Sequence, residues 1–143
     1  MKNTIKTFTI LFLLINTNCK AQQMVQTPND VIKLKINEQQ FINKPLKNLL
    51  KEIKPEIKTA FGTLNPLGTP SYFSFMFLSP QELKQHVKGR KHINLFVYVK
   101  EPVDEWNLGK RSKEIEFQWR KEDLEKYGNF TVVRIKVIER IED

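Results

Sequence analysis

Three segments of the chain alternate between apolar and polar residues: 31–36, 114–119 and 131–138. Successive side chains of a strand point to opposite faces of its sheet, so this period of two predicts strands that are buried on one face only. The side chains that we expect to point inward are Ile32, Leu34, Ile36, Ile115, Phe117, Trp119, Val133, Ile135 and Val137.

Two further segments, 71–78 and 93–99, are rich in β-branched and aromatic residues and are apolar on both faces. One helix covers only one face of a sheet, so loops, sheet curvature, a second copy or a partner must cover the other face. We expect either two central strands of a curled sheet or a binding surface. The residues of that candidate surface are Phe73, Phe75, Phe77, Phe96 and Tyr98, with Trp106 from a loop.

Helical spacing of apolar residues over 46–57 predicts the main helix, which begins near Pro45 and ends by Gly62. A capping box at 79–82 predicts a short helix, and 121–127 predicts one or two further helical turns. We expect Leu46, Leu49, Leu50, Ile53 and Ile57 to form the buried stripe of the main helix, and Leu83 and Val87 the buried side of the short one.

These elements predict an α+β domain. Its sheet is expected to have four to five strands, to be mostly antiparallel and curled, and to carry one main helix packed on one face. With 143 residues and 16.9 kDa the chain has room for one domain. We place that domain at 31–143, after a polar linker at 22–30.

The first 21 residues have the organisation of an export signal. Lys2 and Lys6 precede an apolar segment of eight residues at 8–15, and a polar stretch follows. That segment is far shorter than the ~20 residues that cross a bilayer, so it predicts no transmembrane helix. The signal therefore predicts an exported protein.

Two processing routes fit the end of the signal. Cleavage after Ala21 would release the chain, whereas lipidation of Cys19 would anchor it to a membrane. Cys19 is the only cysteine, so the domain has no disulfide, no thiol nucleophile and no cysteine-rich metal site. Any membrane contact is expected only through a lipid on Cys19.

Residues 2–23, with their Cys-Lys-Ala-Gln ending, resemble the signal sequences of small secreted proteins and lipoproteins of Bacteroidetes-type bacteria. The resemblance implies a protein of the periplasm, a membrane-anchored lipoprotein or a secreted protein. The order of elements is similar to cystatin-like and NTF2-like folds and to small outer-membrane assembly lipoproteins. No functional residue is implied by these likenesses.

The chain is basic, with 24 Lys and Arg against 16 Asp and Glu. Only five of the 24 are arginines, the residue that base and phosphate recognition favours, so we expect no nucleic-acid partner. Two basic loops would form an anion-binding surface if they shared one end of the sheet, and otherwise serve solubility. Their residues are Lys88, Arg90 and Lys91 in one loop and Lys110 and Arg111 in the other.

Catalytic and metal-binding patterns are weak. His86 and His92 are the only histidines, and their spacing of six fits neither a zinc helix nor a short histidine cluster. The acidic pair Glu114 and Glu116 is expected on the solvent face of a strand, and the pair at 104–105 in an exposed loop. No nucleophile elbow or phosphate loop occurs. We expect no catalytic residue, no metal and no cofactor.

Two functions are compatible with these patterns. The first is a non-enzymatic interaction module of the cell envelope, an assembly factor or an immunity-type protein, with a protein partner on the aromatic face. A homodimer through that face is an alternative arrangement. The second is a small-ligand-binding protein or hydrolase with a cone-shaped cavity between helix and sheet, which needs His86, His92, Glu114 or Glu116 to point inward.

Overall fold

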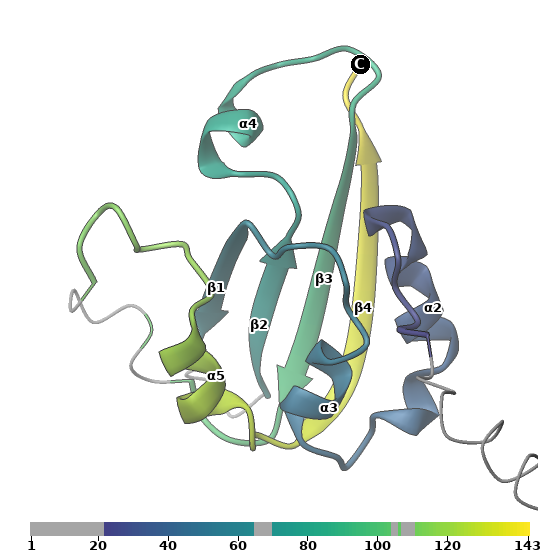
Figure 1. The fold of residues 1–143 in the computed structure, drawn as a ribbon, viewed down its shortest axis with the longest axis vertical. Helices are drawn as coiled ribbons and strands as arrows, with labels where there is room; N and C mark the ends of the chain where they lie inside the picture. Colours follow the sequence, from purple (N-terminus) through teal and green to yellow (C-terminus); the bar gives the residue numbers. More distant parts are fainter. Residues whose placement is uncertain (1–21, 65–69, 104–105, 107–110) are drawn as a thin grey trace, which may run out of the picture.

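The computed structural model describes residues 22–64, 70–103, 106 and 111–143. Four antiparallel strands lie side by side in chain order: β1 (Thr59–Thr63), β2 (Ser71–Met76), β3 (Lys91–Val99) and β4 (Val132–Ile141). Figure 1 shows that β3 and β4 are the longest and extend beyond the end of β2. The predicted α+β class with a mostly antiparallel curled sheet is confirmed.

Several short helices accompany the sheet. They are the 3-10 helices η1 (Pro28–Val31) and η2 (Glu38–Gln40), and the α-helices α2 (Ile32–Ile36), α3 (Leu46–Leu50), α4 (Pro80–Lys84) and α5 (Lys121–Tyr127). In Figure 1, α3 crosses in front of the sheet, α2 runs along β4 and α5 lies near β1. Side chains from η1, α2, α3 and α5 enter the hydrophobic core.

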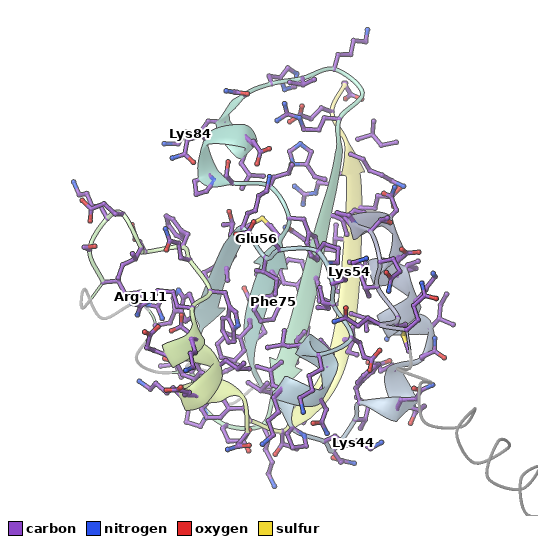
Figure 2. All side chains as sticks on the ribbon, viewed as in Figure 1. Lys44, Lys54, Glu56, Phe75, Lys84 and Arg111 are labelled. Carbon is purple, nitrogen blue, oxygen red and sulfur yellow. The ribbon has the colours of Figure 1, made fainter. Side chains whose placement is uncertain are left out.

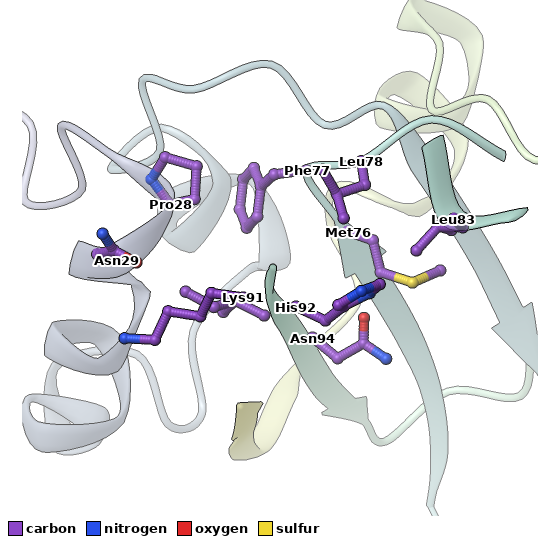
Figure 3. Close-up of a pocket in the computed structure, with 10 residues that line it drawn as sticks. Pro28, Asn29, Met76, Phe77, Leu78, Leu83, Lys91, His92 and Asn94 are labelled. Atoms are coloured by element: carbon purple, nitrogen blue, oxygen red, sulfur yellow. The ribbon is translucent and has the colours of Figure 1, made fainter. Parts of the chain in front are cut away.

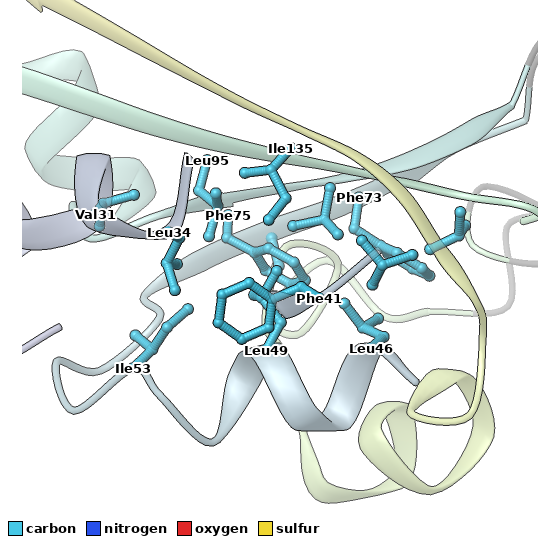
Figure 4. Close-up of a cluster of buried hydrophobic side chains, with 14 of the residues drawn as sticks. Val31, Leu34, Phe41, Leu46, Leu49, Ile53, Phe73, Phe75, Leu95 and Ile135 are labelled. Carbon is cyan, nitrogen blue, oxygen red and sulfur yellow. The ribbon is translucent and has the colours of Figure 1, made fainter. Parts of the chain in front are cut away.

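The core lies between these helices and one face of the sheet, which we name the covered face (Figure 4). Phe73 and Phe75 of β2 and Leu95 of β3 point into it and are fully buried. They meet Leu34 of α2 and Leu49 of α3. The period of two along β2 and β3 therefore places the opposite side chains on the other face, which we name the open face.

The segment 31–36 is helical, so the predicted strand is wrong. Val31 and Leu34 are buried, whereas Ile32 is 47% and Ile36 74% exposed. Positions three apart share one face of a helix, and this pair carries the contact with the core. The short apolar pattern fits both the period of a strand and that of a helix, and the strand interpretation predicted the wrong buried residues.

The main helix is shorter than its apolar stripe. Pro45 precedes it in an extended conformation, as expected, but α3 ends at Leu50. Ile53 is still buried, because its backbone continues into an isolated parallel bridge with Val25. Gly62 does not end the helix but lies in β1, where an added Cβ would be 2.5 Å from Val103 Cγ1. Close packing explains the glycine there.

The predicted strand at 114–119 is a series of turns. Phe117 is 41% exposed, and its carbonyl oxygen accepts a hydrogen bond of 2.7 Å from Ala60 N–H on the outer edge of β1. Trp119 is half-buried and stacks on Trp106 with ring centres 5.9 Å apart. This segment therefore covers the edge of the sheet without being a strand.

The strands predicted at 71–78, 93–99 and 131–138 and the helices at 79–82 and 121–127 are confirmed. The capping box is present, since Ser79 Oγ accepts from Glu82 N–H at 3.1 Å and Glu82 Oε2 accepts from Ser79 N–H at 2.7 Å. Besides Ile32, Ile36 and Phe117, three further expected burials are wrong. Leu83 is half-buried, Val87 is 43% exposed, and Val132 replaces Val133 in the core because the register shifts at the end of β3.

Candidate functional site

Four of the six aromatic residues predicted as a binding surface are core residues. Phe73, Phe75, Phe77 and Trp106 are all less than 9% exposed, so they are not available to a partner. Phe73 packs against Tyr127 of α5, with ring centres 5.1 Å apart. The physical reason is that helices and the 111–119 segment cover this face of β2. Among the described residues, no helix packs across the opposite face in the same way.

Phe96 and Tyr98, the other two predicted residues, lie on the open face and are half-buried. Tyr72 of β2 stands beside both, with ring centres 5.7 Å from Phe96 and 5.3 Å from Tyr98. We name these three side chains the ring cluster. Phe61 and Met76 flank the cluster on neighbouring rows of the sheet. The outcome is an aromatic surface that spans the two central strands.

Three cations of β4 lie on the open face, two of them beside the ring cluster. The register pairs Arg134 with Tyr98, Lys136 with Phe96, and Arg140 with His92. All three cationic residues are exposed, and the Arg134 guanidinium lies 5.4 Å from the centre of the Tyr98 ring. Among the described residues none of the three forms an ion pair of 4.0 Å or less, although the charge of Arg134 contributes to lowering the pKa of Glu38. We name these three residues the cation row.

No carboxylate belongs to the strand positions of the open face. Since neighbouring strands present register partners on the same face, those positions follow from the pairing of the four strands. They are Thr59, Phe61, Thr63, Tyr72, Ser74, Met76, His92, Asn94, Phe96, Tyr98, Arg134, Lys136, Ile138 and Arg140. The open face is thus apolar at its centre and positively charged along β4 from Arg134 to Arg140. Just after β4, the Glu142 carboxylate meets this face at His92, 2.6 Å from its Nε2.

The cation row was not predicted as a binding site from the sequence, although the alternation that exposes its residues could be read there. The alternation over 131–138 already directs Arg134 and Lys136 outward, and Tyr72 is opposite Phe73 in β2. What the sequence lacked was the register that places Arg134 beside Tyr98 and Tyr98 beside Tyr72.

The two predicted basic loops do not form one surface. Arg111 packs 3.7 Å above the Trp106 ring and pairs with the Asp123 carboxylate. The Trp106 ring contacts Phe73, and Phe73 is the register partner of Val97 in β3. Lys91, in the other basic loop, lies six residues from Val97 along the same strand. Six residues of strand correspond to about 20 Å. Lys110 lies outside the described residues, and Figure 2 shows Arg111 far from α4.

The other loop is engaged internally. Arg90 donates to the carbonyl oxygens of Glu82 and Gln85, and Lys91 Nζ lies 2.9 Å from Glu139 Oε1. Lys88 is exposed. Of this predicted anion-binding set, only Lys88 has no such contact among the residues that the structure describes.

Both histidines lie near Glu142, close to the end of β4. His92 Nε2 is 2.6 Å from Glu142 Oε1, and Glu142 Oε2 accepts a 2.6 Å hydrogen bond from Val87 N–H. His86 Nδ1 is 4.0 Å from the same carboxylate, and its side chain is 75% exposed. The Val87 N–H, followed by His92, holds the pKa of Glu142 below its ordinary value. Among the described residues no group of three ligands suited to a metal ion occurs.

Glu114 and Glu116 are exposed and line a shallow groove of about 840 Å³ between α4 and the segments 56–58 and 113–119. A hydrogen bond from Ser112 lowers the pKa of Glu114, so this group favours the ionised form. Residues 104–105, the other acidic pair, lie outside the described residues. The space expected to be a cavity between helix and sheet is filled by core side chains (Figure 4).

A small apolar pocket adjoins the open face where β2 ends, and we name it the end pocket (Figure 3). Its volume is about 110 Å³. The open face contributes Met76, His92 and Asn94, and α4 contributes Leu83. The remaining lining residues are Pro28, Asn29, Phe77, Leu78, Lys91 and Ile93.

In the part of the chain that the structure describes, no helix has the length and apolar character needed to cross a membrane. Comparison with known proteins gives no relative for this chain: no family model matches it, and neither a curated protein nor a solved structure is significantly similar. The fold and the open face are therefore the basis for inferring its function.

Proposed function

We propose that this chain is a non-enzymatic interaction module of the bacterial cell envelope, and that its open face binds an acidic surface of a protein partner. One observation carries the proposal: the ring cluster adjoins a cation row that forms no close ion pair among the described residues, on a face whose strand positions have no carboxylate. Apolar rings and exposed cations together fit a partner surface that has apolar residues among carboxylates.

The ring cluster supports a protein partner. Tyr72 and Tyr98 combine a large apolar ring with a polar end, which is why tyrosine is enriched among residues that dominate binding energy. Their half-buried rings and that of Phe96 are already held by one another, so little side-chain freedom would be lost on binding.

The cation row supports an acidic partner in preference to a second copy. Two copies meeting through the same face about a two-fold axis would bring six like charges near one another. Such repulsion opposes self-association, whereas carboxylates of a different protein would be attracted. Lys136 and Arg140 would also accelerate the encounter at low ionic strength.

The envelope location rests on the export signal in residues 1–21, with either cleavage after Ala21 or lipidation at Cys19. Only five of the 24 basic residues are arginines, which supports a protein partner over a nucleic acid. An assembly component of the envelope and a toxin neutralised by this chain both fit that chemistry.

The test reverses one charge of the open face. Wild type and Lys136→Glu, each tagged at the C-terminus, are purified from the native envelope and their partners are identified by mass spectrometry. Lys136 is exposed, so the variant should fold, and a stoichiometric partner of the wild type should be lost at least tenfold. Lys47→Glu, on the solvent side of α3, is the matched control and should retain the partner.

Equal recovery of the partner by both variants would exclude the open face as its binding surface. A stable dimer of the purified wild type that Lys136→Glu abolishes would identify a second copy as the occupant. Tight binding of the purified protein to anionic phospholipid vesicles, lost in Lys136→Glu and without a protein partner, would assign the face to a lipid surface.

A further inference from the structure

We propose that the end pocket receives one bulky apolar side chain of the acidic partner, so that the partner is recognised through an apolar anchor next to a carboxylate. This inference rests on the proposed function, because the pocket shares Met76, His92 and Asn94 with the open face. It adds the feature that would distinguish one acidic protein from another.

The pocket exists because two paired strands separate. The last register pair of β2 and β3 is Met76 with Asn94, and β3 begins three residues earlier, at Lys91. Beyond that pair the chain turns away from β3 into α4, whose Ser79 cap fixes the start of the helix. Leu83 then closes one side of the space, with Met76 and Phe77 on β2's side (Figure 3).

The size of the pocket selects one side chain. A dry apolar cavity of about 150 Å³ is large enough to hold benzene. The about 110 Å³ of the end pocket is therefore suited to a branched aliphatic side chain such as leucine. Transfer of a leucine side chain from water into an apolar site is expected to strengthen binding by roughly 10- to 100-fold.

The charges around the pocket define the neighbour of that side chain. Lys91 is held by Glu139 and His92 by Glu142, so both are already engaged. Arg140, the register partner of His92, has no ion pair among the described residues. A carboxylate of the partner, one or two residues from the anchoring side chain, would pair with Arg140. The recognised segment therefore combines an apolar residue with a nearby acidic one.

The experiment uses two acetylated and amidated nonapeptides of glutamate, aspartate and serine, which differ only in a central leucine or glycine. Each is titrated into the purified protein at low ionic strength, and the NMR signal of the Met76 methyl group is followed. The leucine peptide should bind about tenfold tighter or more, and only this peptide should shift the Met76 signal.

Two variants fill the pocket. Leu83→Trp fills it from α4, and Leu78→Phe fills it from the strand side, in case the first disturbs the helix. Either should bring the affinities of the two peptides to within about twofold of each other. Leu124→Trp, at a 39% exposed leucine of α5, is the matched control and should leave the tenfold difference intact.

Equal affinities of the two peptides for the wild type would overturn the proposed apolar anchor. If Lys136→Glu weakens that binding, the open face is still supported as the binding surface. A leucine preference that persists in both pocket-filling variants would also overturn it. If neither peptide binds, the proposed combination of an apolar anchor and a carboxylate is overturned. The partner purification with Lys136→Glu then decides the proposed function separately.

Discussion

At the scale of single residues, Arg111 shows how a basic residue can be structural. The sequence places it in a lysine-rich loop, where it resembles an anion-binding residue. In the structure its guanidinium lies over Trp106 and pairs with Asp123, and their side chains are 12% and 5% exposed. Asp123 also accepts a hydrogen bond of 2.8 Å from Arg120 N–H at the start of α5. Arg111 therefore supports the helix and the aromatic core together.

Removal of Arg111 should be costly because it leaves the buried Asp123 carboxylate with only the more distant Arg120 guanidinium, 3.9 Å away. We expect Arg111→Ala to lower the free energy of unfolding by about 3 kcal/mol. Lys121→Ala, which breaks the exposed pair with Glu125, is the control and should cost less than about 0.5 kcal/mol. Urea denaturation followed by tryptophan fluorescence measures both. Equal costs would show that the Arg111 pair is no more important than a surface pair.

The candidate site was partly predictable from single residues. Alternation alone places Phe96 and Tyr98 opposite Leu95 and Val97, and Arg134 outward. It could not say which face of β2 and β3 the helices would cover, and it grouped Phe73 with Phe96 although the two point to opposite faces. That choice depends on contacts between residues far apart in the chain.

At the scale of elements, the errors fall where a short pattern had two solutions. The segment 31–36 has a strand pattern, yet the helical spacing of Val31 and Leu34 matches the core. Glu38, which follows α2, satisfies a backbone group at the edge of β4 that a further strand would otherwise bind. Its Oε1 accepts a hydrogen bond of 2.6 Å from Ile135 N–H, at the outer edge of β4. A carboxylate thus occupies the place of a neighbouring strand.

Loss of that carboxylate should open the edge of β4. Burial opposes ionisation of Glu38, but hydrogen bonds from Lys35 and Ile135 N–H outweigh it and keep the pKa of Glu38 below its ordinary value. We expect Glu38→Ala to cost about 1–3 kcal/mol of unfolding free energy. Hydrogen exchange at Ile135 should accelerate as well, whereas Gln39→Ala, an exposed neighbour, should leave it unchanged. Unaltered exchange in Glu38→Ala would exclude this role.

At the scale of the whole molecule, several carboxylates are held in the ionised form by the fold. Hydrogen bonding by Lys33 and then Thr27 lowers the pKa of Asp30 from 3.8 to about 2. The Ser79 backbone N–H and then Lys58 lower the pKa of Glu82 from 4.5 to about 2. At Glu101, burial opposes ionisation, but the N–H and hydroxyl of Thr131 outweigh it, so its pKa is also lowered.

These shifts have one sign and predict acid sensitivity. Because the folded pKa values lie below the unfolded ones, the stabilisation is complete above about pH 5 and is lost as the pH falls toward 2. The free energy of unfolding, measured with urea at successive pH values, should be level from pH 7 to 5 and then decline. Glu82→Gln should reduce the steepness of that decline. A level profile down to pH 2 would contradict the assigned hydrogen bonds.

Most of the sheet was predictable because its central strands are long and apolar on both faces. The segments that became β2, β3 and β4 all have unambiguous strand patterns, and antiparallel neighbours need only short connections. The segment that became β1 was not predicted as a strand. It is short, it contains Gly62, and its pairing with β2 depends on packing against Val103 and Trp106.

Each edge strand of the sheet has a backbone N–H occupied by a group that is not a strand. The carbonyl oxygen of Phe117 accepts a hydrogen bond from Ala60 N–H on β1. The carboxylate of Glu38 accepts one from Ile135 N–H on β4. A chain approaching sideways would have to displace one of them before it could extend the sheet there. Encounters between copies at these points are therefore discouraged, and growth into fibrils would first require local unfolding at a margin. The protein can therefore reach a high concentration while its broad face stays free.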